Sequence, residues 1–222
     1  MSNQSFIPPG PGTRKLKGQP GCRVFLLRHG ETANAHEVCM NGHYDVDLSS
    51  AGFEQIRSIG QALKDHPIAA VYSSDLQRTF KGAQIIAEHH SLQPVPFAEL
   101  RELSFGHWEG LSVRELNTRF PGELDKRIQN TSTFQADGGE TFQQLHDRVI
   151  PKYEDIINQH PDETIVIMSH GGVNRTLLAH LLGFPADNLF RIAQEYAAVN
   201  ILQYYESHVV VELVNGAAGQ IR

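Results

Sequence analysis

The sequence predicts an α/β protein, a three-layer α/β/α sandwich with a mainly parallel sheet and one antiparallel edge strand. Three observations support this fold class. Short apolar runs alternate with segments of helical periodicity, a polar turn follows each run, and the last two runs are joined by only a short polar connection. Alternating strands and helices are typical of a parallel sheet covered by helices on both faces.

The first strand–helix unit begins with the apolar run 24–27, which stops at Arg28 and His29. An uninterrupted apolar run indicates a strand that is buried on both faces. After a polar loop, apolar residues at spacings of three and four indicate a helix, for which Ser49 or Ser50 can act as N-cap. A charged pair is therefore expected at the end of a buried strand.

A second unit repeats this order. Residues 69–73 are expected to form a strand, and Ser74 and Asp75 provide a capping signal for a helix that carries Arg78 in its first turn. The arginine should therefore lie at the same edge of the sheet as the charged pair.

The second half of the chain contains a long helix and a third unit. Residues 142–157 have helical spacing, and Pro151 should bend or interrupt that helix. Residues 164–168 form the clearest apolar run, which ends near His170 and precedes a helix from Val173. The strand–turn–helix pattern thus occurs a third time.

The final strands are expected over residues 199–205 and 209–214, and their short connection predicts the antiparallel edge. A chain of 222 residues suffices for one buried core, and we expect a single domain over residues 23–216. Residues 1–22 are rich in proline and glycine and are expected to form a flexible N-terminal extension.

Composition excludes several classes of protein. A net charge of −6 provides no general basic field for nucleic acid or for a membrane surface. No secretory leader is recognisable and no segment approaches the ~18 apolar residues of a membrane span, so a cytoplasmic protein is expected. Cys22 and Cys39 have no metal-ligand spacing, and neither a metal ion nor a cofactor is expected.

Charged side chains follow different expected strands, namely Arg28, His29, Arg78 and His170. The carboxyl ends of parallel strands meet at one edge of a sheet, and helices that start there direct backbone N–H groups at an anion. Taken singly, an arginine such as Arg78 is more often a solvated helix residue, and only the joint occurrence favours a site. The sequence therefore predicts a small cationic pocket for a phosphate.

At this point the chain resembles the histidine phosphatase superfamily, also called the phosphoglycerate mutase-like family, over about residues 23–214. Five segments carry the resemblance: Leu27-Arg28-His29-Gly30-Glu31-Thr32, Ser73-Ser74-Asp75-Leu76-Gln77-Arg78, Leu100-Arg101-Glu102-Leu103-Ser104-Phe105-Gly106-His107-Trp108-Glu109-Gly110, Gly138-Gly139-Glu140-Thr141 and Met168-Ser169-His170-Gly171-Gly172.

This resemblance implies that His29 accepts the phosphoryl group and that Glu102 protonates the leaving oxygen. It also implies that Arg28, Arg78 and His170 hold the phosphoryl group. A neutral imidazole is a competent nucleophile at pH 7, and neighbouring arginines would disfavour its protonation. Guanidinium groups and backbone N–H groups can meet the charge on the equatorial oxygens without a metal ion.

Further contacts with the substrate are expected from Asn34, Asn41, Gly42 and Gly171. Ala35 stands where the family usually has an asparagine, and Asn34 is the candidate to replace it. Residues 104–140 are expected to form a lid that selects the substrate.

The pattern around Glu102 is similar to that of the small phosphatases rather than the glycolytic mutases. The segment 188–201 is similar to alpha-ribazole-5'-phosphate phosphatases, which act late in cobalamin assembly. The expected partner is therefore a small phosphorylated substrate, and a homodimer is compatible with the sequence. Among enzymes, the alternatives are a broad-specificity sugar-phosphate phosphatase, a fructose-bisphosphatase-like enzyme, a phosphohistidine protein phosphatase and a cofactor-dependent phosphoglycerate mutase. A non-catalytic module that binds a phosphorylated ligand also stays open.

Overall fold

The computed structural model describes residues 20–222. Its centre is a six-stranded sheet in the order β3-β2-β4-β1-β5-β6. The strands are β1 (Pro20–Arg28), β2 (Ile68–Ser73), β3 (Val95–Pro96), β4 (Thr164–Ser169), β5 (Val199–Tyr205) and β6 (His208–Gly216). The strands β1 to β4 are parallel, whereas β5 runs antiparallel to both of its neighbours. The predicted sheet, mainly parallel with an antiparallel edge, is confirmed.

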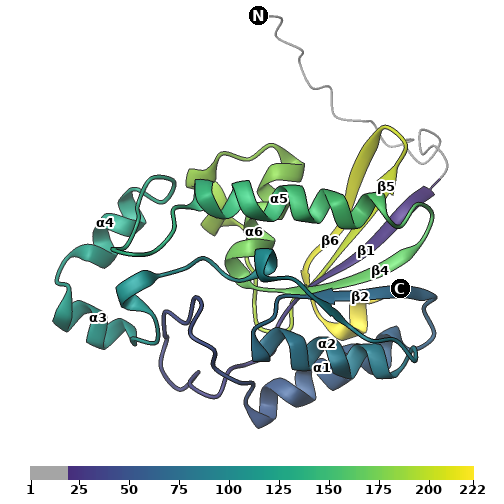
Figure 1. Ribbon diagram of the computed structural model, residues 1–222, viewed down its shortest axis with the longest axis horizontal. Helices are drawn as coiled ribbons and strands as arrows, with labels where there is room; N and C mark the ends of the chain where they lie inside the picture. Colours follow the sequence, from purple (N-terminus) through teal and green to yellow (C-terminus); the bar gives the residue numbers. More distant parts are fainter. Residues whose placement is uncertain (1–19) are drawn as a thin grey trace, which may run out of the picture.

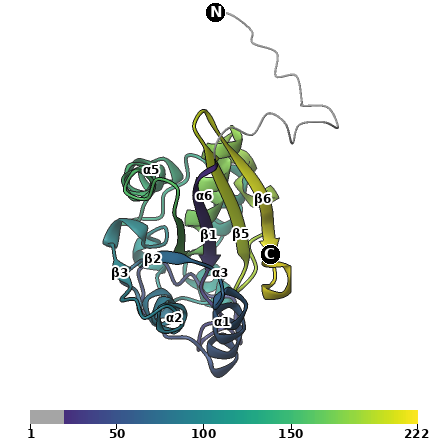
Figure 2. The same cartoon turned by 90° about the vertical axis from the view of Figure 1, so that its right-hand side faces the viewer.

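Helices cover both faces of this sheet (Figures 1 and 2). The α-helices of the described residues are α1 (Ser50–Leu63), α2 (Gln77–Glu88), α3 (Val113–Arg119), α4 (Glu123–Gln129), α5 (Phe142–Asn158) and α6 (Gly171–Leu182). Helices α1 and α2 pack on one face, and α5 and α6 pack on the other. The three-layer architecture is therefore also confirmed.

Strand β1 shows how the sequence produces two cores. Successive side chains of a strand point to opposite faces. Val24 and Leu26 pack with α5 and α6, whereas Phe25 and Leu27 pack with α1 and α2. All four side chains are fully buried. A strand that lies between two helical layers must be apolar at every position, which explains the uninterrupted run.

Helices α3 and α4 lie to one side of the sandwich, at the left of Figure 1. A small separate core of Trp108, Leu116 and Ala136 supports this region. The sequence predicted a lid here but neither helix, because each helix has only seven residues and so contains too few turns for a clear periodicity.

Several boundaries differ from the predictions. Strand β1 begins at Pro20 rather than Val24, because pairing with β5 extends to Tyr205. The start of the predicted flexible extension, residues 1–19, lies outside the described residues. Helix α6 begins at Gly171, two residues before the expected start.

Two local predictions were wrong. The N-cap of α2 is Leu76, whose side chain makes no capping hydrogen bond, and Asp75 instead forms an ion pair with Arg101. The interruption expected at Pro151 is absent, because Pro151 lies inside α5, which runs unbroken from Phe142 to Asn158. Burial of Val149, Ile150 and Tyr153 outweighs the hydrogen bond that the proline cannot donate.

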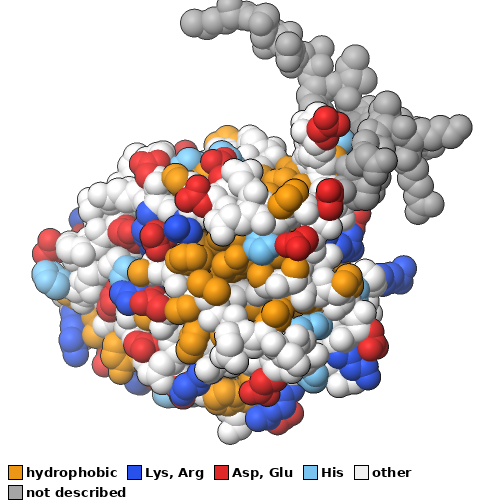
Figure 3. Space-filling model, turned by 45° about the vertical axis from the view of Figure 1, so that its right-hand side comes forward, with side chains coloured by type: hydrophobic (Ala, Val, Ile, Leu, Met, Phe, Trp, Pro, Cys, Tyr) orange, Lys and Arg blue, Asp and Glu red, His pale blue; other side chains and the backbone are white. Residues whose placement is uncertain are grey.

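The surface gives no sign of a general basic field on the face that Figure 3 shows, where acidic and basic side chains are interspersed. None of the helices in residues 20–222 combines the length and the apolar character that a membrane crossing requires. A site for an anion must therefore depend on local positive charge.

Candidate active site

His29 directly follows β1, where its backbone N–H donates to the carbonyl of Ser169 at the end of β4 (3.0 Å). Its side chain is only 5% exposed. Nδ1 lies 2.7 Å from the carbonyl oxygen of Gly30, an acceptor, so Nδ1 carries the proton and the lone pair is on Nε2. Burial, and then the charges of Arg78 and Arg28, hold the pKa of His29 well below its usual value. The ring is thus neutral, with a defined tautomer and its free lone pair on Nε2.

Two arginines flank this ring. Arg78, 1% exposed, donates from Nη2 to the carbonyl of Gly42 (2.6 Å) and from Nη1 to that of Tyr44 (3.0 Å). Arg28 donates from Nη1 to the carbonyl of Gln194 (2.5 Å), and its guanidinium lies 4.3 Å from the ring centroid of Tyr196. Burial lowers the pKa of both arginines, that of Arg78 to about 10. The Nε atom of each is buried and has no protein partner.

His170 is fully buried beside His29, with a distance of 5.2 Å between the ring centroids. Its Nε2 lies 2.8 Å from Oγ of Ser74, whose hydroxyl also contacts Oγ1 of Thr79 (2.6 Å). Ser74 therefore orients the second histidine instead of capping α2. Burial, and then the charge of Arg78, hold the pKa of His170 well below its usual value. Its Nδ1 has no partner.

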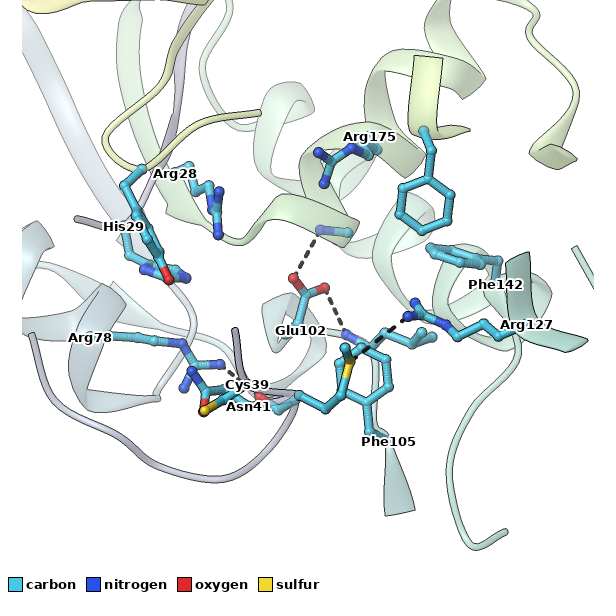
Figure 4. A pocket seen from close by; sticks show the side chains of 16 residues that line it. Arg28, His29, Cys39, Asn41, Arg78, Glu102, Phe105, Arg127, Phe142 and Arg175 are labelled. Carbon is cyan, nitrogen blue, oxygen red and sulfur yellow. Dashed lines mark hydrogen bonds between the residues drawn. The ribbon is translucent and has the colours of Figure 1, made fainter. Parts of the chain in front are cut away.

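Glu102 places a carboxyl group in the centre of the pocket (Figure 4). Oε1 accepts from the N–H of Leu103 (2.8 Å), and Oε2 accepts from the N–H of Gly172 (2.9 Å). A Cβ atom at Gly172 would lie 2.3 Å from Oε1, so glycine is needed for this close approach. Arg148 of α5 donates to the carbonyl oxygens of Arg101 and Glu102 (both 2.8 Å), which fixes the loop.

Six of the nine predicted site residues line one pocket, and the other three lie beside it. Arg28, His29, Asn41, Gly42, Arg78 and Glu102 line it. His170 and Gly171 adjoin residues of the lining. The ring centroid of His170 lies 5.2 Å from that of His29. A Cβ atom placed on Gly171 would lie 3.0 Å from Nη1 of Arg175 and 3.4 Å from Nε of Arg28. Asn34 does not line the pocket. Its amide donates to that of Asn41 (2.7 Å), so it supports a residue that lines the pocket.

Sequence reasoning missed two further arginines, Arg127 of α4 and Arg175 of α6, which line the same pocket. Arg175 lies four residues after Gly171, on the helix face that includes the pocket, and this spacing was an available signal. No comparable signal marks Arg127. In the part of the chain from residue 20 onward, no group of three or more His, Cys, Asp and Glu side chains is arranged to hold a metal ion.

Comparison with known proteins agrees with this geometry. The model of the histidine phosphatase superfamily, branch 1, matches residues 24–216. Phosphoglycerate mutase-like protein 4 of Arabidopsis thaliana is 37% identical over 157 residues, which cover 69% of this chain and 68% of that protein.

Two solved structures are similar in fold. The alpha-ribazole phosphatase of Shigella flexneri has a TM-score of 0.80 at 26% identity, covering 87% of this chain and 96% of that one. A mycobacterial glucosyl-3-phosphoglycerate phosphatase in complex with VO3 has a TM-score of 0.80 at 26% identity, covering 88% and 99%. Fold, family model and sequence identity agree, and the chain therefore belongs to branch 1 of the histidine phosphatase superfamily.

Proposed function

We propose that this enzyme hydrolyses phosphate monoesters without a metal ion, through a phosphohistidine formed on Nε2 of His29. One observation carries the proposal. Three buried nitrogen atoms without a protein partner, Nε of Arg28, Nε of Arg78 and Nδ1 of His170, belong to the side chains that surround His29. Buried donors without a partner cost free energy, and an anion on the nucleophile would remove that cost.

The first step forms a bond between Nε2 and phosphorus and breaks the bond between phosphorus and the ester oxygen. The two guanidinium groups bind the equatorial oxygens, where the negative charge is concentrated. Glu102 gives its proton to the departing oxygen, which leaves as an alcohol. Its two backbone hydrogen bonds keep the carboxyl group in the pocket beside the leaving group.

In the second step a water molecule attacks phosphorus and Glu102 takes up its proton. The bond between Nε2 and phosphorus breaks, and inorganic phosphate leaves. The lone pair returns to a ring that is neutral again, because its surroundings disfavour the imidazolium form. The cycle ends with every residue in its starting protonation state.

The substrate proposed from the sequence is alpha-ribazole 5'-phosphate, a precursor in cobalamin assembly. Its support is the likeness to the solved alpha-ribazole phosphatase from Shigella flexneri. Other phosphate esters are candidates as well, because relatives of this chain are named glucosyl-3-phosphoglycerate phosphatase and phosphoserine phosphatase 1.

The test uses purified protein in EDTA with a panel of esters: alpha-ribazole 5'-phosphate, sugar phosphates, and 3-phosphoglycerate with its bisphosphorylated primer. Release of phosphate supports the proposal. Isomerisation without net release would show a mutase, and absence of both reactions would favour a binding module.

A second experiment traps the intermediate. Wild type quenched in alkali should carry labelled phosphate that is lost in acid, as expected of phosphohistidine, whereas His29→Ala should carry none and show no turnover. His36→Ala, which changes an exposed histidine outside the pocket, is the matched control. Turnover by His29→Ala would refute the mechanism.

A further inference from the structure

The pocket contains positive charge on both sides of Glu102. Arg28 and Arg78 lie on the side of His29, whereas Arg127 lies on the opposite side and Arg175 lies above the carboxyl group (Figure 4). We propose that Arg127 and Arg175 form a second anion subsite, so that the preferred substrate is a compact phosphate ester that carries a second anionic group, a carboxylate or another phosphate. The inference rests on the proposed function, because it assigns the rest of the same substrate.

Aromatic rings fix the two guanidinium groups. The Arg127 group lies 4.8 Å from the ring centroid of Phe105 and 5.7 Å from that of Phe190, and the Arg175 group lies 5.6 Å from that of Phe190. A cation over a ring face is stabilised by the quadrupole of the ring, and its N–H edges stay available. The rings therefore orient both groups and leave their N–H edges available to a ligand.

The hydrogen bonds of these arginines leave donors unused. Arg175 donates from Nε to the carbonyl of Ile192 (2.8 Å), and the nearest polar contact of Arg127 runs from Nη1 to the weakly accepting sulfur of Met40 (3.9 Å). Among residues 20–222, no carboxylate oxygen lies within 4.0 Å of a nitrogen of either side chain. Neither arginine has a counterion in direct contact.

Electrostatics favours an anion at this position. Burial lowers the pKa of both arginines, and the charge of Arg175 lowers that of Arg127 further. Glu102 attracts both groups, but it also attracts Arg28 and Arg78. Glu195 also attracts Arg28 and Arg175, whereas Glu102 is the carboxylate that attracts Arg127. When Glu102 carries the proton that it donates in catalysis, a phosphate beside His29 would balance Arg28 and Arg78, and a second anion would balance Arg127 and Arg175.

One small molecule can reach both subsites. Arg28 and Arg175 flank the same point, since both approach a Cβ built at Gly171 within 3.4 Å. The same cavity is lined by His29, Glu102, Arg127 and Arg175. This arrangement ranks phosphorylated acids and bisphosphates above alpha-ribazole 5'-phosphate, in which the phosphate is the single anionic group.

The test compares matched ester pairs that differ in one anionic group: 3-phosphoglycerate with glycerol 3-phosphate, phosphoserine with phosphoethanolamine, and fructose 1,6-bisphosphate with fructose 6-phosphate. The first two pairs test a carboxylate and the third tests a second phosphate. Wild type should prefer the more anionic member of at least one pair in kcat/KM. Arg127→Gln and Arg175→Gln should each reduce that preference by about 10- to 100-fold, as expected for lost charge-assisted hydrogen bonds.

Arg119→Gln is the control, because it removes a positive charge from an exposed position of α3 outside the pocket, and it should keep the wild-type preference. Arg127→Lys should restore part of the preference. If wild type and both glutamine variants show the same kcat/KM ratio for every ester pair, the proposed subsite is refuted. The proposed phosphatase activity is unaffected by that result.

If wild type hydrolyses no ester, the proposed function fails, and calorimetric binding of 3-phosphoglycerate and glycerol 3-phosphate then decides on the subsite. Binding that favours 3-phosphoglycerate in wild type and loses that preference in both glutamine variants would support it. Equal affinities in wild type would overturn it.

Discussion

Acidification should destabilise this protein through the two neutral histidines of its active site. The folded pKa values of His29 and His170 lie well below the ordinary value of about 6.5, because the rings are buried beside Arg78 and Arg28. Below pH 6.5 the unfolded chain binds protons at both positions and the folded chain does not. The histidines therefore cost no stability above pH 6.5, and the free energy of unfolding falls as the pH is lowered further.

The magnitude follows from linkage. Between pH 7.5 and 5.5 each histidine should reduce the free energy of unfolding by roughly 1 to 2 kcal/mol, so the pair accounts for about 3 kcal/mol. Carboxylates with lowered folded pKa values, such as Asp75, act below about pH 4, outside this window. The partly exposed His90, whose pKa is lowered by burial, contributes equally to the wild type and to variants of the other two histidines.

Urea titrations at pH 7.5 and 5.5 measure the effect, at constant ionic strength and in buffers without phosphate, which would bind the site. The wild-type midpoint should fall by about 1 M more than that of His29→Gln/His170→Gln, and each single variant should lie between them. An equal fall in the wild type and the double variant would refute the assignment of neutral, buried histidines.

Three further predictions concern the acid and its support. Glu102→Gln should slow hydrolysis of alkyl phosphates by about 100- to 10,000-fold but that of p-nitrophenyl phosphate far less, because a nitrophenolate leaves without protonation; equal losses would argue against an acid role. Gly172→Ala should displace the same carboxyl group, since the new Cβ would lie 2.3 Å from Oε1, and should show the same dependence on the leaving group in steady-state rates. Arg148→Met leaves Glu140 without its ion pair and should lower the free energy of unfolding by about 3 kcal/mol in urea titrations, while Lys152→Met on the same helix should change it little.

The sheet and the side chains at its carboxyl edge were predictable because a simple rule connects them. Apolar runs mark the buried strands, and residues that follow parallel strands meet at one edge. This rule placed His29 after β1 and His170 after β4, as the structure has them. Glu102 follows no strand of this kind, and only the resemblance to a family indicated it.

The remaining features depend on contacts that no local pattern encodes. Arg127 stands in a seven-residue helix without a buried residue, and nothing in its neighbourhood distinguishes it from Lys126. Arg127 differs from Lys126 in its tertiary contacts. The rings of Phe105, Phe142 and Phe190, which are distant in sequence, all lie near its guanidinium group. The capping error at Ser74 has a similar origin, because His170, 96 positions away, binds its hydroxyl group.

His29 and Glu102 are held in place by different secondary-structure elements. The backbone of His29 bonds to the end of β4, whereas Arg148 of α5 binds the backbone of Glu102 and Gly172 of α6 binds its carboxyl group. The distance between the proposed nucleophile and the proposed acid consequently depends on how α5 and α6 dock on the sheet. Substitutions in that docking surface, such as at Leu145 or Val149, can retune the enzyme for leaving groups of different size without altering any residue that touches phosphate.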